Sequence, residues 1–163
     1  MPTTTIMNSI QSIKVSIDDI LGSVEILDEK AIRWNPTEEE WSILQILSHL
    51  NEAIPYWLDE IERVVTKPGS KWGRGLADDN RLAAVASPDQ LEIKEEIKKI
   101  KEIQQLVSDR LTGLSETQLN DINPHRNFEK FGYKPVSFII DHFLVEHVSN
   151  HSIQIKRNIS KLK

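Results

Sequence analysis

The sequence contains no cysteine, so it can form no disulfide, offers no thiolate nucleophile and gives a metal ion no sulfur ligand. Basic residues are not in excess either: 20 lysines and arginines stand against 25 aspartates and glutamates, for a formal net charge of -5. Proteins that bind the phosphate backbone usually carry a basic excess on one face, so we expect no nucleic-acid partner. Any thiol chemistry must use a thiol from a bound small molecule.

Long apolar runs are also missing. Nowhere do about 18 apolar residues follow one another, and Met1 to Thr5 lacks a basic segment followed by an apolar run. We therefore expect no membrane span, no membrane partner and no signal peptide, and place the protein in the cytoplasm. With 163 residues, 39% of them hydrophobic, the chain is long enough for one domain over residues 1–163 and too short for two independent cores.

Glycine and proline are few, at six and seven residues, and they cluster. Between the clusters, apolar residues recur at three- and four-residue spacing, which predicts long amphipathic helices. We expect four of them, over residues 6–30, 42–67, 87–111 and 135–162. Ser42 and Gln45 predict a capping box at the start of the second helix, and Pro55 predicts a kink within it. Four such helices indicate an all-α fold, a four-helix bundle.

Two connections are long enough to suggest a use. Residues 67–86 are too many for a tight turn between helices, and we treat this segment as a candidate lid. It holds Trp72 and Arg74, and the loop before the last helix holds His125 and Arg126. A flat apolar ring and charged groups over a site are typical of substrate contacts, so these four residues are candidates for substrate binding. Ordinary loop packing is the alternative for each.

Three of the five histidines form a candidate metal site. His147 and His151 are four residues apart in the last predicted helix, which puts their side chains about 5–6 Å apart on one face. That spacing suits two imidazole ligands of one ion. His49 lies in an apolar part of the second helix, where a buried imidazole needs partners for both ring nitrogens, and a metal ion would be one. Hydrogen bonding within the core is the alternative interpretation of these histidines.

Three histidine ligands leave at least one coordination position open, as in catalytic sites. We therefore expect the catalytic group to be a metal-bound water or thiolate, with no catalytic side chain identified. Neutral nitrogens suit zinc, nickel, iron or copper, and we expect a divalent ion, zinc or nickel before the others. His142 is five residues before His147, about 140° around an α-helix, so we expect it to face elsewhere. We count His142 and His125 as non-ligands.

Two groups of residues occur together in one known family. The first is Trp34-Asn35-Pro36, Trp41-Ser42 and Ile46-Leu47-Ser48-His49-Leu50, and the second is His147-x-x-x-His151-x-x-Gln154-Ile155 in the last predicted helix. With them the chain resembles the DinB-like superfamily, which includes the YfiT-like proteins, of bacterial damage-inducible and thiol-transferase proteins. The resemblance implies a four-helix bundle in up-down-down-up order, with a divalent metal held by His49, His147 and His151.

The resemblance also implies residues around the ligands. Gln154 takes the family's glutamine position after the last ligand, where it would pack against or orient that histidine. Many relatives have an acidic residue four positions before the first histidine, where this chain has Gln45. Glu52, three residues after His49, is the candidate replacement that would hydrogen-bond to the ligand ring and hold its orientation.

The resemblance implies a function as well. Characterised relatives include enzymes that move a low-molecular-weight thiol onto an electrophile, which implies a metal-dependent transferase that joins a bacillithiol-like thiol, as co-substrate, to a small electrophile. A metal-dependent hydrolase of a small molecule and a non-catalytic, metal-stabilised bundle in a stress response stay open as alternatives. We expect a small-molecule substrate, and a homodimer is a further possibility that the sequence leaves open.

Overall fold

The computed structural model describes residues 3–162. Four long helical segments make up the bundle: α1 (Thr4–Val24), α3 (Ile43–Thr66), α5 (Ile93–Leu111) and a C-terminal helix that consists of α8 (Val136–Ile140), the π-helical segment η2 (Asp141–Glu146) and α9 (His147–Ser160). Residues 1 and 2, the first two of the segment considered above for a signal peptide, lie outside the described residues. None of the helices described is long and apolar enough to cross a membrane.

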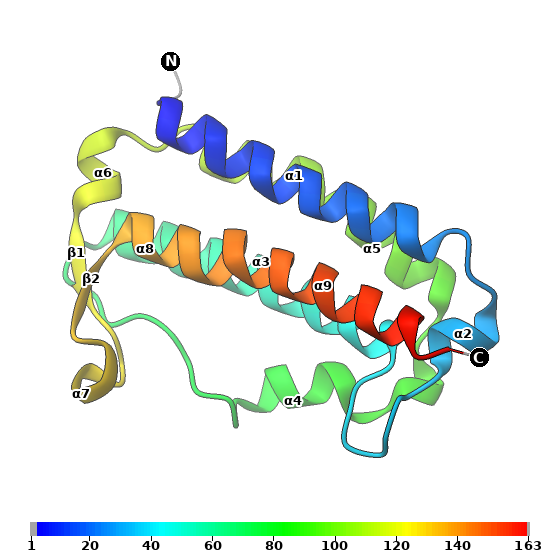
Figure 1. Ribbon diagram of the computed structural model, residues 1–163. Helices are drawn as coiled ribbons and strands as arrows, with labels where there is room; N and C mark the ends of the chain where they lie inside the picture. Colours follow the sequence, from blue (N-terminus) through cyan, green and yellow to red (C-terminus); the bar gives the residue numbers. More distant parts are fainter. Residues whose placement is uncertain (1–2, 163) are drawn as a thin grey trace.

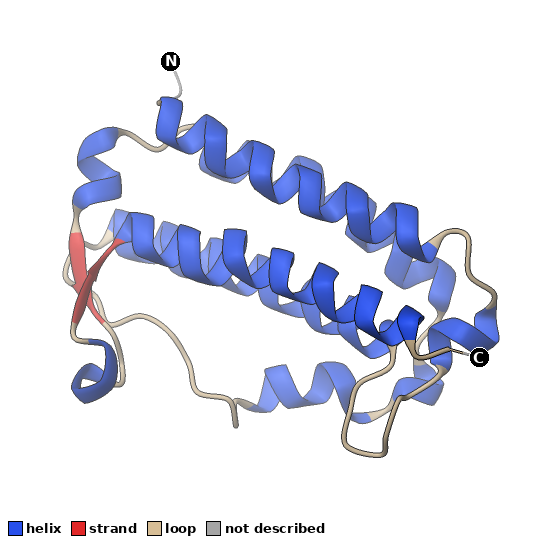
Figure 2. Ribbon diagram, in the orientation of Figure 1, coloured by secondary structure: helices blue, strands red, loops and turns tan. Residues whose placement is uncertain are grey.

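Short elements connect these helices. They are α2 (Glu29–Arg33), α4 (Asp79–Ala86), the 3-10 helix η1 (Pro88–Gln90), α6 (Glu116–Asn120), α7 (Phe128–Phe131) and the strands β1 (Ile122–Pro124) and β2 (Tyr133–Pro135). The strands pair antiparallel, with Asn123 opposite Lys134, and form a small ribbon at one end of the bundle (Figure 2). Helices therefore make up nearly all of the regular structure in residues 3–162.

The direction of the long helices gives the topology. In Figure 1, α1 and the C-terminal helix run one way, and α3 and α5 run the other way. Helix α1 packs against α5 and α9, and α3 packs against α5, α8 and α9. The all-α four-helix bundle in up-down-down-up order, expected from the sequence, is confirmed.

The apolar stripes of the helices face one shared core. In α1 the buried residues follow the three- and four-residue spacing that keeps side chains on one face of a helix: Ile6, Ile10, Ile13, Ile17, Ile20 and Val24. In α5 the same spacing buries Ile100, Ile103, Val107 and Leu111, while most of its charged residues face solvent. The core also takes in Trp72, which the segment after α3 inserts into the bundle end.

Two predicted helix boundaries are wrong. The helix expected over residues 6–30 ends at Val24, and a separate helix α2 begins at Glu29, because the side chain of Asp28 accepts a hydrogen bond from the backbone N–H of Ala31 and caps a new start. The helix expected from residue 87 begins at Ile93, since Ser87 makes no side-chain cap and Pro88–Gln90 forms a 3-10 turn.

The capping box of α3 is confirmed. The hydroxyl oxygen of Ser42 accepts a hydrogen bond from the backbone N–H of Gln45, and the side-chain oxygen of Gln45 accepts one from the backbone N–H of Ser42. The helix then continues across Pro55 to Thr66, so the proline does not end it. His49 lies two turns after this cap, on the buried face of α3.

The candidate lid, residues 67–86, lies along α3. It leaves the end of α3, crosses behind the β-ribbon and ends in α4, which packs against α3 (Figure 1). Asp78 caps α4 by accepting a hydrogen bond from the backbone N–H of Arg81. The segment thus covers one side of α3. Its movement as a lid stays a prediction.

Candidate metal site

Three histidines from two helices meet inside the bundle. His49 comes from α3, and His147 and His151 come from the first two turns of α9. The Nε2 atom of His147 lies 3.0 Å from Nε2 of His49 and 3.0 Å from Nε2 of His151. Two nitrogens bonded at about 2.1 Å to one ion, at a right angle, lie about 3.0 Å apart. Within residues 3–162 this is the one cluster of three metal-ligating side chains.

The three Nε2 atoms cannot satisfy one another by hydrogen bonding. A neutral imidazole carries one N–H and one lone pair. Nδ1 of His151 lies 2.7 Å from the side-chain oxygen of Gln154, and with the proton assigned to Nδ1 it donates there and leaves a lone pair on Nε2. Whichever proton is placed on His147 or His49, at least one of the three Nε2 atoms lacks a partner. A cation at the meeting point satisfies all three lone pairs.

Burial keeps the cluster neutral. Desolvation, together with the positive charge that His147 and His151 would carry, lowers the pKa of His49 to about 2. Desolvation and the charge of His151 lower the pKa of His147 to about 3, and desolvation also lowers the pKa of His151. All three rings therefore offer lone pairs at neutral pH, without competition from protons.

The two residues expected behind the ligands have different roles. Gln154 contacts His151 through its amide oxygen and fixes the orientation of that ring. Glu52 does not reach His49: its two carboxylate oxygens accept hydrogen bonds from Arg74 at 2.6 and 2.7 Å. Nδ1 of His49 is buried with no partner among the described residues. Glu52 therefore holds Arg74 beside the site and does not orient a ligand.

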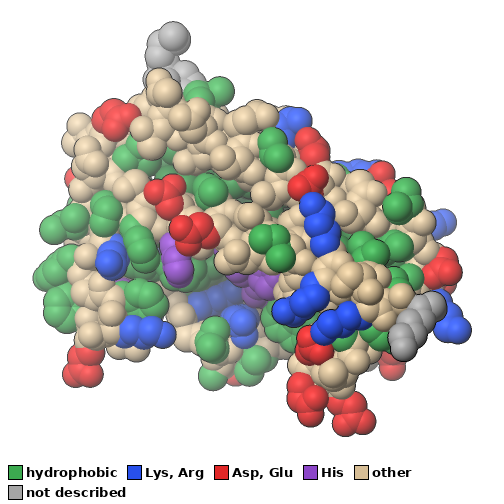
Figure 3. Space-filling model, in the orientation of Figure 1, with side chains coloured by type: hydrophobic (Ala, Val, Ile, Leu, Met, Phe, Trp, Pro, Cys, Tyr) green, Lys and Arg blue, Asp and Glu red, His purple; other side chains and the backbone are tan. Residues whose placement is uncertain are grey.

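The histidines open onto a cavity of about 390 Å³. Its walls come from α3, from the segment 67–86 and from the C-terminal helix: His49, Ala53, Trp57, Arg74, Gly75, Leu76, Arg81, His142, Phe143, Glu146, His147, Asn150 and His151. In Figure 3, histidine surface is visible at a hollow beside Lys and Arg surface on the viewed face. A small molecule can therefore reach the open side of the cluster.

The position of His142 differs from the expectation. A regular α-helix would turn it about 140° away from His147, but residues 141–146 form a π-helical segment with wider, i→i+5 turns. The wider turn brings His142 to the cavity of the three histidines, outside the cluster itself. Its Nδ1 lies 3.2 Å from a carboxylate oxygen of Glu146, and its ring stacks on Phe138. The expectation that His142 faces elsewhere is wrong.

Trp72 and His125 lie in the core, away from this cavity. Trp72 is fully buried, and its indole N–H donates to the backbone carbonyl of Asn123. The ring of His125 packs edge-on against Trp72, and its Nδ1 accepts a hydrogen bond from the backbone N–H of Asn127. Neither side chain has a free face for a substrate, and both tie the segment after α3 to the β-ribbon.

The two arginines expected to contact substrate lie in different places. Arg74 lines the histidine cavity but has a side chain only 7% exposed, held between Glu52 and Asp78. Arg126 is exposed and lines a neighbouring cavity next to Tyr56 and Glu60. The sequence did not single out Arg81, which α4 places in the wall of the histidine cavity. The sequence signal that could have predicted this position is Asp78, a helix-capping residue followed by a short apolar pattern, which together indicate a helix containing Arg81.

Gly73 has a conformation and surroundings that only glycine suits. Its φ is +93°, and a Cβ there would lie 2.3 Å from Nε2 of the buried His125. We expect Gly73→Ala to lower the free energy of unfolding by about 2–4 kcal/mol, since backbone strain adds to displacement of a packed ring. Urea unfolding measures this. Gly75→Ala, where a Cβ would meet nothing within 4 Å, is the matched control, and equal losses in the two variants would refute the assignment.

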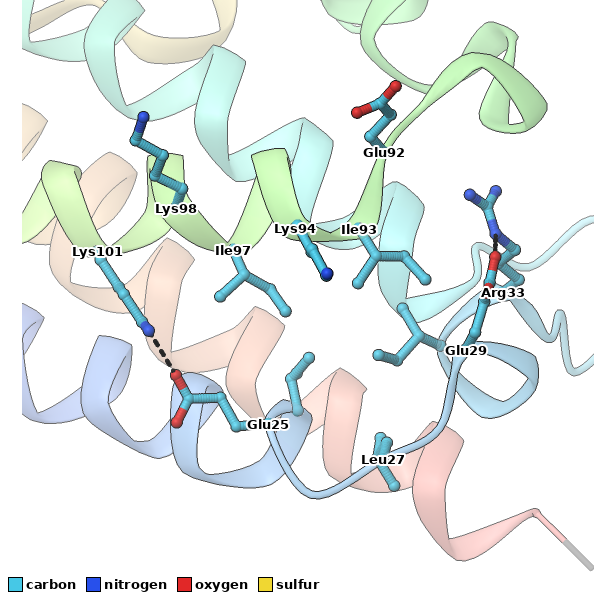
Figure 4. Close-up of a pocket in the computed structure, with 12 residues that line it drawn as sticks. Glu25, Leu27, Glu29, Arg33, Glu92, Ile93, Lys94, Ile97, Lys98 and Lys101 are labelled. Carbon is cyan, nitrogen blue, oxygen red and sulfur yellow. Dashed lines mark hydrogen bonds and ion pairs between the residues drawn. The ribbon is translucent and has the colours of Figure 1, made fainter.

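A second cavity, of about 700 Å³, lies between the α1–α2 connection and the start of α5 (Figure 4). Its apolar side chains include Leu27, Ile93 and Ile97. Charged residues pair at its rim, as Lys101 does with Glu25 at 2.9 Å. It contains no histidine and none of the metal-ligating cluster, so the histidine cavity is the candidate functional site.

Comparison with known proteins agrees with this fold. A model of the DinB superfamily matches residues 13–155. Among solved structures, YfiT from Bacillus subtilis, described as "a probable metal-dependent hydrolase with an unusual four-helix bundle topology", matches with a TM-score of 0.81 at 12% identity, over 99% of this chain and 89% of that chain. At this identity the likeness is one of fold. No curated protein sequence matches the chain.

Proposed function

Because the chain belongs to the DinB superfamily, we propose that it is a metal-dependent enzyme acting on a small molecule. The Nε2 atoms of His49, His147 and His151 hold one divalent cation, zinc or nickel. The observation that carries the proposal is the convergence of three neutral imidazoles on the wall of a cavity of about 390 Å³, with Nε2 of His147 3.0 Å from Nε2 of His49 and 3.0 Å from Nε2 of His151. When bound, the cation stabilises the deprotonated form of a thiol or a water beside it.

The protein's own residues prepare this site. Burial keeps the imidazoles neutral, and Gln154 holds the proton of His151 on Nδ1, so that Nε2 faces the cavity. Trp57 and Phe143 stack with ring centroids 4.0 Å apart and form an apolar wall. This wall limits water around the bound substrate and strengthens electrostatic interactions within the cavity.

A low-molecular-weight thiol is the nucleophile that the donor set favours. The cluster contains no carboxylate, and Glu52 is held in a two-point ion pair with Arg74, so neither the cluster nor Glu52 supplies a free carboxylate base beside the three Nε2 atoms. A thiol would need no such base, because a cation held by the three histidines would favour the deprotonated form of the thiol. Since the chain has no cysteine, the thiol is a co-substrate, bacillithiol-like in its chemistry. The reaction is then transfer of the thiol to a small electrophile.

Water is the nucleophile in a second candidate function, hydrolysis. The pair of His142 and Glu146 lines the same cavity, with 3.2 Å between Nδ1 and the carboxylate oxygen. An imidazole oriented by a carboxylate can accept a proton at Nε2, as in general-base catalysis. YfiT, which shares the fold, is described as a probable metal-dependent hydrolase.

Activity of the zinc-loaded protein separates these functions. We expect consumption of small thiols with monochlorobimane as electrophile, abolished by chelation and by His147→Ala. His142→Ala should keep at least about half of this activity, because a thiolate needs no base. Ester hydrolysis without thiol consumption, lost in His142→Ala, would replace the transferase by the hydrolase. A zinc-loaded protein with neither activity would contradict the enzyme proposal.

A further inference from the structure

The guanidinium group of Arg81 faces the histidine cavity and has no carboxylate partner among the described residues. Arg81 lies in α4, lines the cavity, and has its guanidinium 5.8 Å from the centre of the Trp41 ring. Its Nη1 donates to the backbone carbonyl of Leu76 at 3.1 Å. With the carboxylates of residues 3–162 it forms no ion pair. Four of its five N–H donors are therefore available to a ligand.

The neighbouring arginine is in the opposite situation. Arg74 pairs with both oxygens of Glu52 and lies 3.3 Å from Asp78, so its charge is compensated by the protein. Glu52 and Asp78 thus serve Arg74 and are not within ion-pair distance of Arg81. Burial and the charge of Arg74 lower the pKa of Arg81, and the charges of Glu52 and Asp78 offset this only in part.

The charges around the cavity favour an anion. Arg81 lines it without an ion-pair partner, whereas the charge of Arg74 is balanced by Glu52 and Asp78. Glu146, its one lining carboxylate, faces His142. A divalent cation at the three histidines would add further positive charge within the same small space. Two positive groups in a cavity repel each other until an anion enters between them. This local excess stands out in a chain whose formal net charge is -5.

We propose that Arg81 binds a carboxylate group of the small-molecule substrate, and so selects anionic substrates for the site. The planar guanidinium can hold both carboxylate oxygens through parallel N–H donors, which a neutral amide of equal size cannot match. This inference rests on the proposed function, because it names the chemical class of the substrate that would enter the same cavity. Arg81 acts as a specificity residue and takes no part in holding the metal.

Binding of a matched pair of probes tests this role. Calorimetric titration of the chelator-treated, metal-free full chain with butyrate and with butyramide compares equal shapes that differ in charge, without a cation that would itself attract butyrate. We expect butyrate to bind at least about tenfold more tightly, and Arg81→Gln to reduce this preference to less than about twofold. Arg126→Gln removes the same charge from an exposed arginine outside the cavity and should keep the preference. Arg81→Lys, which keeps the charge without the fork, should retain part of it.

Zinc content, measured separately on every variant, distinguishes the two proposals. A wild-type chain that binds no zinc overturns the metal-dependent enzyme but leaves the test of Arg81 standing, because that test uses the metal-free protein. Equal affinity of the wild type for butyrate and butyramide overturns the role of Arg81. So does a preference that survives in Arg81→Gln, or one that Arg126→Gln removes as fully as Arg81→Gln does.

Discussion

Replacing His49, His147 or His151 with alanine is expected to weaken zinc binding at least about 100-fold, while His142→Ala binds zinc as the wild type does. The three residues each supply one Nε2 atom to a single point, and two remaining nitrogens hold an ion far less well than three. Loss of a residue that only orients a ligand lowers metal affinity about 10–100-fold, so loss of a ligand itself is expected to lower it by at least the upper end of that range. Equilibrium dialysis against zinc with elemental analysis measures the affinities.

His142→Ala is the matched control because His142 lines the same cavity in the same helix but lies outside the cluster. Circular dichroism of each variant establishes that the helices are intact, so that a loss of zinc is not a loss of fold. An equal fall of zinc affinity in all four variants would mean that the ion lies elsewhere in the cavity. Unchanged zinc binding in His49→Ala would remove α3 from the site.

The metal-free protein is expected to lose stability as the pH falls below about 6.5. In the unfolded chain the histidines titrate near pH 6.5, whereas burial lowers the folded-state pKa to about 2 for His49 and to about 3 for His147. Between these values the unfolded chain binds protons that the folded chain cannot, so the folded state is fully stable above the unfolded pKa and weakens on acidification. Each residue lowers the free energy of unfolding by up to about 1.4 kcal/mol for each pH unit below 6.5, so the pair lowers it by up to about 3 kcal/mol per pH unit.

Urea unfolding in the presence of a chelator, repeated at several pH values, measures this loss. The double variant His49→Gln/His147→Gln removes two of the three titrating groups of the cluster and should show a much shallower dependence of the unfolding free energy on pH. His142→Gln, at an exposed position, should follow the wild type. If the double variant were as acid-sensitive as the wild type, groups other than the cluster would cause the acid sensitivity.

The features that could be predicted from the sequence are local in origin. The spacing of His147 and His151, the isoleucine stripe of α1 and the capping box of Ser42 and Gln45 each depend on residues within one or two helical turns. The regular helical period therefore places them correctly. The meeting of His49 with the other two histidines follows from the same rule, because each lies on the buried face of its helix.

The features that could not be predicted depend on distant contacts or on a change of helix type. The π-helical segment at 141–146 has no periodic signal, yet it brings His142 to the cavity. Glu52 finds its partner Arg74 at a distance of 22 residues, which helix spacing cannot reveal. Trp72 is buried because residues 72–73 lie against His125, a contact between two loops far apart in the chain.

X-ray absorption spectroscopy at the zinc edge of the zinc-loaded full chain tests the central claim most directly. We expect one zinc ion per chain with three imidazole nitrogens at about 2.0–2.1 Å, recognised by the outer-shell scattering of the rings. His142→Ala should give the same spectrum. A zinc ion surrounded by oxygen alone, or by a single imidazole, would show that His49, His147 and His151 do not share one cation.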